Sequence, residues 1–360
     1  MRSGAISASN AAATGVSATG AGPVNVYVSN TVGAGLTGIN ATSTGSGVVT
    51  VNASNTVSGT NGDGVDATSG GGNILVTTAA VNGKLFGVKT VTSNNGTTNV
   101  STNGAVQASA GSGISATTSG IGTVTVATGG STTGTGGTGI IAGSTGGAAI
   151  VVNVGGVTSG TNGYGVKATT TGGNANVNVT VGVGDSISGT TGAVLATAAG
   201  SGNVDFNGYG MHGSGTITTP GARAIDAESG FGTVTVDAWN AGISAATTGI
   251  FASSSGDINV GTRGGTYHGG SIWTSISGFS GAGSAGIDAE GAGAGTITIN
   301  YSNYFTNGIT GAGTGGDVGI KAVNTTGAIT INTYVDGTPG AITNVNQYGI
   351  YAATNNNTGG

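Results

Sequence analysis

Short hydrophobic phrases recur along this 360-residue chain, separated by runs of Gly, Ser, Thr and Asn. The commonest is Gly-(Ile/Val)-x-Ala, and its copies between Gly15 and Gly165 are spaced by 23 or 26 residues. A second phrase, such as Val49-Thr50-Val51, alternates apolar and polar residues, which is the pattern of a half-buried strand. Weaker apolar pairs, such as Val57-Ser58, precede the next copy. Each repeat is therefore predicted to hold three short strands and three turns. The phrase begins at Gly15, Gly38, Gly64, Gly113, Gly139, Gly165, Gly249, Gly286, Gly319 and Gly349, with degenerate copies at Gly87, Ala193 and Ala224.

A repeat of this size cannot bury a core alone, whereas stacked repeats share one. The sequence therefore predicts an all-β fold, a right-handed single-stranded parallel β-helix of about twelve rungs, each of 23–37 residues with three short strands. The Ile or Val and the Ala of the first phrase have the same parity, so both are expected to point inward. Gly is expected at the corners, where only short side chains stack without crowding. Twelve rungs at the strand spacing of ~4.8 Å predict a rod on the order of 60 Å long.

The repeat also suggests boundaries along the chain. Residues 1–14 are expected to be a lead-in segment, 15–348 the repeat domain, and 349–360 a partial rung with an Asn- and Gly-rich tail. From about residue 192 onward the rungs lengthen and carry most of the aromatic residues. A disordered linker is the alternative interpretation of such a composition, but linkers do not keep their apolar residues in phase.

Composition narrows the class of protein. The 79 glycines have no three-residue period, which excludes collagen. Seven basic against 12 acidic residues disfavour a nucleic-acid partner, and no apolar run is long enough for membrane insertion by this segment. Without Cys the chain forms neither disulfides nor thiolate metal sites, and no cofactor is expected. The N-terminus lacks the apolar core of a signal peptide, so we expect an internal piece of a larger protein.

Repeats of Gly-Ile-x-Ala and Val-Thr-Val that are poor in charge and Cys resemble the passenger regions of bacterial autotransporters and related surface exoproteins. The resemblance extends over roughly residues 11–355. It implies a β-helix displayed on the surface of a Gram-negative cell or secreted, serving as an adhesin, an aggregation factor or a stalk. The implied partners are host or surface glycans, proteins, or further copies of the chain.

Two acidic pairs are the strongest candidates for catalysis. Asp226 and Glu228, like Asp288 and Glu290, are two residues apart in predicted strands, so each pair shares one face at about 6.5–7 Å. The alternative function is accordingly a polysaccharide-active enzyme, a lyase or hydrolase, with its cleft over residues 226–290. Solvated outward positions are the competing interpretation, and calcium binding would need more oxygen ligands than these.

Aromatic residues point to a binding surface instead. Fourteen of the 17 follow position 200, and they coincide with the longer rungs. A candidate binding loop contains Arg263, Tyr267, His268 and Trp273, residue types that stack on sugars or anchor interfaces. The competing interpretation is that wider rungs need larger core residues, and Tyr301 has inward parity. The loops expected to make contact are 206–215, 261–281 and 301–316.

Further expectations concern the remaining polar residues. Outward Thr columns, with Thr50 and Thr125 as members, suggest an ice-binding solenoid as a third and weaker alternative. Equivalent residues of adjacent rungs should form ladders, which places Asp66 beside Lys89. The same alignment places Asp288 beside Lys321. His212 and His268, the only histidines, have no Cys nearby to complete a zinc site.

Overall fold

The computed structural model describes residues 5–208, 215–238, 242–261, 275–303, 308–313, 315–335 and 342–354, with the backbone alone for 302, 303, 334 and 335. The chain forms an all-β parallel solenoid of about twelve turns, and three strands per rung build three parallel sheets, as the repeat predicts. The right-handed sense of the coil stays a prediction. Among the described residues no helix is long and apolar enough to cross a membrane.

The chain divides into two compact units, Met1–Gly172 and Gly173–Gly360. In the first unit, sheet A contains β1 (Ile6–Ala8), β4 (Val32–Ala34), β7 (Val57–Gly59), β10 (Val81–Gly83), β13 (Val106–Ala108), β16 (Thr132–Gly134) and β19 (Thr158–Gly160). Sheet B contains β2 (Val16–Gly20), β5 (Ile39–Ser43), β8 (Val65–Ser69), β11 (Phe86–Thr92), β14 (Ser112–Thr118), β17 (Ile140–Ser144) and β20 (Tyr164–Thr170). Sheet C contains β3 (Val24–Val28), β6 (Val49–Ala53), β9 (Ile74–Thr78), β12 (Thr98–Thr102), β15 (Val124–Thr128) and β18 (Ile150–Val154).

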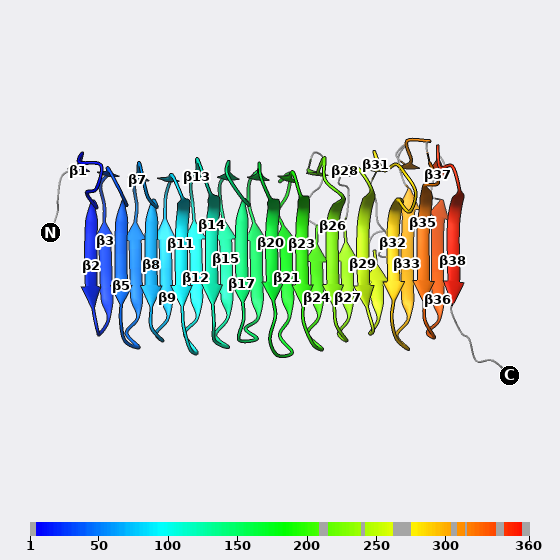
Figure 1. Ribbon diagram of the computed structural model, residues 1–360, viewed down its shortest axis with the longest axis horizontal. Coiled ribbons are helices and arrows are strands. Elements are labelled where there is room, and N and C mark those ends of the chain that lie inside the picture. Colours follow the sequence, from blue (N-terminus) through cyan, green and yellow to red (C-terminus); the bar gives the residue numbers. More distant parts are fainter. Residues whose placement is uncertain are drawn as a thin grey trace. The chain divides into compact units, whose positions relative to one another are not determined.

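The second unit repeats this arrangement, and the short strands of its sheet A lie at the top of Figure 1. Its sheet A contains β22 (Ile187–Gly189), β25 (Thr216–Thr218), β28 (Gly242–Ser244), β31 (Ser275–Ser277), β34 (Ile309–Thr310) and β37 (Ile342–Thr343). Its sheet B contains β23 (Gly192–Ala198), β26 (Arg223–Ser229), β29 (Thr248–Ser254), β32 (Ala285–Gly291), β35 (Val318–Asn324) and β38 (Tyr348–Thr354). Its sheet C contains β21 (Val177–Val181), β24 (Val204–Asn207), β27 (Val234–Asp237), β30 (Ile258–Val260), β33 (Ile297–Asn303) and β36 (Ile329–Val335).

The register stacks like residues on like, rung after rung. Ile114 of β14 lies between Val88 and Ile140, and Ala116 pairs with Ala142 in the next strand. All five are fully buried, which confirms the predicted inward parity of the first phrase. Because a β-branched residue and a small residue alternate on the inward face, opposing sheets can interdigitate without voids.

The glycine of the first phrase lies where neighbouring strands approach each other closely. A Cβ on Gly113 would lie 2.7 Å from the carbonyl oxygen of Gly139 and 2.8 Å from Cγ2 of Thr132. Both distances are shorter than real Cβ contacts, so a side chain at this corner forces neighbouring strands apart. Alanine nevertheless occupies the equivalent positions 193 and 224 in the second unit, where both residues are fully buried.

Inward hydroxyl groups line the corner between sheets B and C, a feature that the sequence pattern did not predict. Ser69 is buried and donates to the carbonyl oxygen of Gly47 at 3.1 Å, while the Gly72 amide donates to its Oγ at 2.8 Å. Ser229 makes the same two contacts in the second unit, donating to the carbonyl oxygen of Gly202 in the preceding turn and accepting from the Gly232 amide. These hydroxyls satisfy backbone groups that the tight turns would otherwise bury without partners.

Large aromatic residues fill the core of the second unit. Phe206 and Phe279 are fully buried, and Tyr301 is 3% exposed, so the inward orientation predicted for Tyr301 is confirmed. Burial raises the pKa of the Tyr301 phenol. Wider rungs are thus filled by larger side chains, which is the core interpretation of these three residues.

Candidate functional site

The candidate binding loop cannot be placed in the fold. Arg263, Tyr267, His268 and Trp273 lie outside the described residues, and so does His212. Only parts of the loops 206–215, 261–281 and 301–316 are described. Within those parts the three aromatic side chains that are described, Phe206, Phe279 and Tyr301, belong to the core, so they offer no contact surface.

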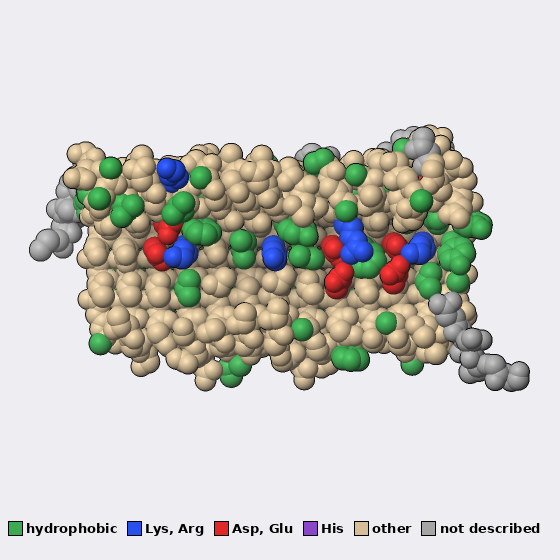
Figure 2. Space-filling view, in the orientation of Figure 1, with side chains coloured by type: hydrophobic (Ala, Val, Ile, Leu, Met, Phe, Trp, Pro, Cys, Tyr) green, Lys and Arg blue, Asp and Glu red, His purple; other side chains and the backbone are tan. Residues whose placement is uncertain are grey.

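The two acidic pairs lie in one column of sheet B, as the rung alignment predicts. Asp226 of β26 pairs in register with Phe251 of β29, and Phe251 pairs with Asp288 of β32. Glu228 and Glu290 occupy the same two strands, two residues further on. In Figure 2 acidic and basic side chains gather in compact groups on a face that otherwise carries little charge.

The first group is built around Arg223. Its Nη1 lies 3.0 Å from Oδ2 of Asp226 and 3.2 Å from Oε1 of Glu228, and its guanidinium carbon lies 3.4 Å from the centre of the Phe251 ring. Arg223 and Phe251 together cover Asp226, which is only 9% exposed. Burial raises the pKa of Asp226 to about 6, although the nearby Arg223 charge opposes the shift.

The second group repeats the design with a lysine from the next strand. Lys321 of β35 donates to Oδ2 of Asp288 at 3.1 Å and to Oε1 of Glu290 at 2.7 Å. Burial alone would lower the pKa of Lys321, but its hydrogen bonds and the charges of both carboxylates raise it overall. Burial also raises the pKa of Asp288, against the effect of Lys321. The predicted contact between Asp288 and Lys321 is confirmed.

The expectation that these acids are solvated is wrong for the two aspartates. Asp226 and Asp288 are 9% and 5% exposed, whereas both glutamates remain partly exposed. One oxygen of each aspartate, Oδ1, is buried without a hydrogen-bond partner among the described residues. Long side chains on neighbouring strands cover an outward position as effectively as a core does. No group of three or more His, Cys, Asp or Glu suited to a metal ion occurs in the described part of the chain.

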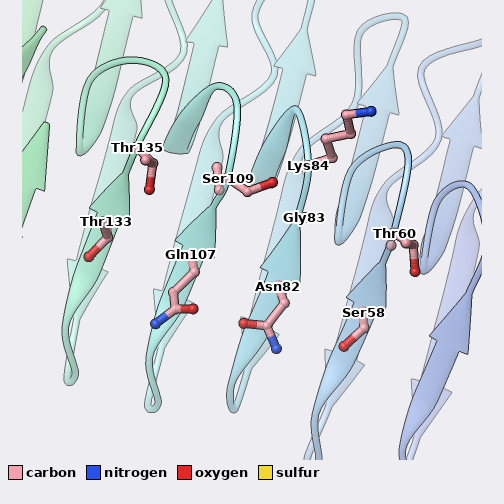
Figure 3. A pocket seen from close by; sticks show the side chains of 11 residues that line it. Ser58, Thr60, Asn82, Gly83, Lys84, Gln107, Ser109, Thr133 and Thr135 are labelled. Carbon is pink, nitrogen blue, oxygen red and sulfur yellow. The ribbon is translucent and has the colours of Figure 1, made fainter. Parts of the chain in front are cut away.

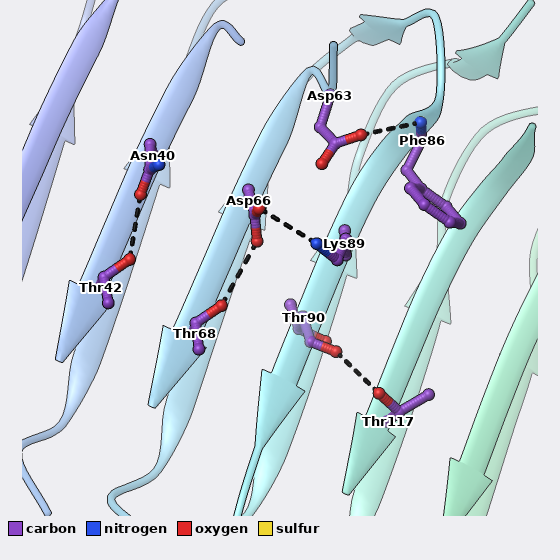
Figure 4. Close-up of polar contacts among 9 residues, drawn as sticks. All are labelled: Asn40, Thr42, Asp63, Asp66, Thr68, Phe86, Lys89, Thr90 and Thr117. Carbon is purple, nitrogen blue, oxygen red and sulfur yellow. Dashed lines mark hydrogen bonds and ion pairs between the residues drawn. The ribbon is translucent and has the colours of Figure 1, made fainter. Parts of the chain in front are cut away.

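A smaller ladder crosses sheet B of the first unit (Figure 4). Lys89 of β11 donates to Oδ2 of Asp66 of β8 at 3.2 Å, which confirms the predicted pair. Thr68 donates to Asp66 at 3.4 Å, and the Phe86 amide donates to Asp63 at 3.1 Å. Burial is the main reason that the pKa of Asp63 is raised. The contacts of Lys89 with Asp66 and of Phe86 with Asp63 join adjacent rungs, so they support the register of the stack.

A groove on sheet A of the first unit is the hollow that sequence reasoning missed. It has a volume of about 460 Å³ and crosses β7, β10, β13 and β16 (Figure 3). The groove is lined by polar side chains, among them Ser58, Asn82, Lys84, Gln107 and Thr133, and by small residues between them. The sequence does show the polar row of the groove, because the middle residues of β7, β10 and β13 are polar and point outward, but it does not show the hollow beside that row.

The outward Thr columns are interrupted. On sheet C of the first unit, Thr50 and Thr125 belong to one column, but Leu75 and Asn99 lie between them. Leu75 is largely exposed there. This face therefore presents a mixed polar and apolar column and not an unbroken threonine array.

No family model matches the chain, and no curated protein and no solved structure matches it either. The resemblance to autotransporter passengers thus depends on the repeat alone. Function has to be argued from the surfaces of the described residues and from their chemistry.

Proposed function

We propose that this chain is a structural and adhesive β-solenoid, displayed on a cell surface or secreted, similar in role to the passenger region of an autotransporter. The observation that carries this proposal is the chemistry of the outward columns. In register, they repeat hydroxyl and amide side chains such as Ser58, Asn82 and Gln107 from one rung to the next. Such a surface suits many weak polar contacts.

Repetition supports adhesion because binding by several equivalent positions adds up. A single exposed hydrogen bond contributes only about 0.5–1.5 kcal/mol, but contacts along one rigid surface share a single association cost. The described acidic pairs of sheet B are each held by a cation, so these charges serve the solenoid itself. A stiff stack would also hold an adhesive face away from the cell.

The proposal can be tested with the purified full chain coupled to fluorescent beads. Folded-chain beads should be retained on cell layers or surface polysaccharide and should cluster with one another more than beads coated with heat-unfolded chain. Equal retention and equal clustering for the two bead types would refute an adhesive role and leave only a stalk.

A polysaccharide-active enzyme remains the second candidate, and one observation favours it. Burial raises the pKa of Asp226 to about 6, and Arg223 brings its carboxyl and that of Glu228 to one guanidinium group. Two neighbouring carboxyls, one of them with a raised pKa, are the groups that general acid and base catalysis uses. Incubation with neutral and uronic-acid polysaccharides should release new reducing ends or unsaturated products, and Glu228→Gln should abolish them. Product formation equal to a boiled control would reject this candidate.

A further inference from the structure

The groove over β7, β10, β13 and β16 offers more than a generally polar surface. We propose that it binds one strand of an uncharged polysaccharide, which lies across these four strands and along the stack. This inference rests on the proposed adhesive function and names the ligand class for one face. The hollow is formed between two rows of outward side chains, with the small residues Gly59, Gly83 and Ala108 beneath them.

Hydrogen-bonding groups in the groove are available to a ligand. Ser58, Asn82, Gln107 and Thr133 occupy the middle of the four strands and are in register with one another. Within the described part of the chain, none of these side chains forms a hydrogen bond or ion pair. In Figure 3 both amide groups, those of Asn82 and Gln107, extend from adjacent strands. The two amide groups thus offer four N–H donors and two carbonyl oxygens to the hydroxyl groups of a ligand.

The outward pairs of sheet B show that such availability is not general. There, Thr42 donates to Asn40 at 3.0 Å, and Thr68 donates to Asp66, so polar groups two residues apart satisfy each other. In the groove the corresponding residues two positions on are Thr60, Lys84, Ser109 and Thr135, and no such contacts form within the described chain. Exposed amides without internal partners are what recognition of sugar hydroxyls requires.

The spacing of the groove also fits a polysaccharide. Neighbouring parallel strands are about 4.8 Å apart, so equivalent side chains repeat at that interval along the stack. One residue of an extended β-linked hexose chain has nearly the same length. A sugar strand lying along the stack can therefore meet one amide or hydroxyl per residue over all four strands. A peptide in an extended strand rises only about 3.2–3.4 Å per residue, so its residues would not keep step with this repeat.

Charge favours a neutral ligand. Lys84 is the one charged residue among those lining the groove, and it is exposed. A single solvated cation contributes about 1 kcal/mol or less to an ion pair, which is too little to select a polyanion. Binding should consequently depend on hydroxyl contacts and change little with salt.

The test uses the full chain and three uncharged polymers, xyloglucan, galactomannan and a mixed-linkage β-glucan, with polygalacturonate and heparin as charged probes. Isothermal titration should detect binding of at least one uncharged polymer at low and high salt. The double variant Asn82→Ala with Gln107→Ala should weaken that binding about tenfold or more, because each amide loses its hydrogen bonds. The matched control is Asn52→Ala with Asn99→Ala, which removes two exposed amides from sheet C and should leave binding unchanged.

Several results would overturn the inference. These are equal affinity of the groove variant and the unaltered chain for uncharged polymers, binding of charged polymers alone with loss at high salt, and equal weakening by the sheet C control. Bead adhesion separates this failure from failure of the proposed function. If unaltered and groove-variant beads adhere equally well, adhesion stands and the groove assignment falls. If unaltered beads do not adhere, the adhesive function itself is wrong.

Discussion

Two buried threonines interrupt the valine column of sheet A and provide a sharp test of the packing. Val81 and Val106 are followed in register by Thr132 of β16 and Thr158 of β19. Both threonines are fully buried, and their Oγ1 atoms have no hydrogen-bond partner among the described residues. Replacing both by Val restores the column with side chains of nearly the same shape. The double variant Thr132→Val with Thr158→Val should therefore be more stable.

The magnitude follows from the burial of two unsatisfied hydroxyls. An unpaired buried hydroxyl costs about 1–3 kcal/mol in proteins, so removing both should raise the free energy of unfolding by about 2–6 kcal/mol if the two effects add. Thr132 and Thr158 are neighbours, so the effects of the two substitutions on the free energy of unfolding need not add. The two single variants should therefore be measured beside the double variant. Because valine adds a methyl where the hydroxyl was, the packing density of the column is maintained.

Urea unfolding followed by circular dichroism measures the effect. The midpoint should move to higher urea while the slope stays constant, as expected for a change in the folded state alone. Thr133→Val is the matched control, because Thr133 is the outward neighbour of Thr132 and its substitution should shift the midpoint little. A midpoint that stays unchanged or falls in the double variant would show that these hydroxyls are satisfied, and that the column is not a simple apolar stack.

Three further results are expected from unfolding measurements. Burial raises the pKa of Asp237 to about 6 from 3.8, so its contribution to stability is present at low pH and is lost as the pH rises through about 6. Asp237→Asn should flatten this part of the plot of stability against pH, and an unchanged plot would contradict the expectation. The partly exposed pair of Asp66 and Lys89 should show a coupling of about 1 kcal/mol or less in a double-mutant cycle, and a much larger value would refute the register-only role. Ser69→Ala should lower the free energy of unfolding by about 1–3 kcal/mol, because the Gly47 carbonyl and the Gly72 amide lose their hydrogen bonds to the hydroxyl. A neutral result would mean that water replaces the hydroxyl.

The repeat was sufficient to predict the fold and the register because length changes fall in the turns. Asp66 and Lys89 are 23 positions apart, whereas equivalent residues of several other repeats are 26 apart. The two residues nevertheless pair in register, because the apolar residues of their strands keep the same phase. The same holds for Asp288 and Lys321, which are separated by a longer rung. A period of two within a strand, combined with a glycine or alanine at the start of each repeat, leaves one pairing that buries the Ile or Val of the first phrase in the column of its neighbours.

The candidate sites were harder to predict because they depend on neighbours across strands. Asp226 reads as a solvated outward residue in the sequence, and only the positions of Arg223 and Phe251 show that it is covered. Ser69 has the same side chain as many outward residues, but it lies at a corner where a turn carbonyl needs a donor. The groove arises from Gly83 and Ala108 beneath longer residues, a difference in height that no linear pattern records.

The parallel register also explains how such a chain can acquire a binding face without risk to its core. In strands such as β6 and β13, inward and outward residues alternate, so an outward substitution there leaves the buried columns unchanged. Because the next rung places the equivalent residue directly alongside, one polar position per repeat becomes a continuous row. Asn82 beside Gln107 is such a row at its shortest length. Recognition of a repetitive ligand therefore needs only the repetition that already forms the fold.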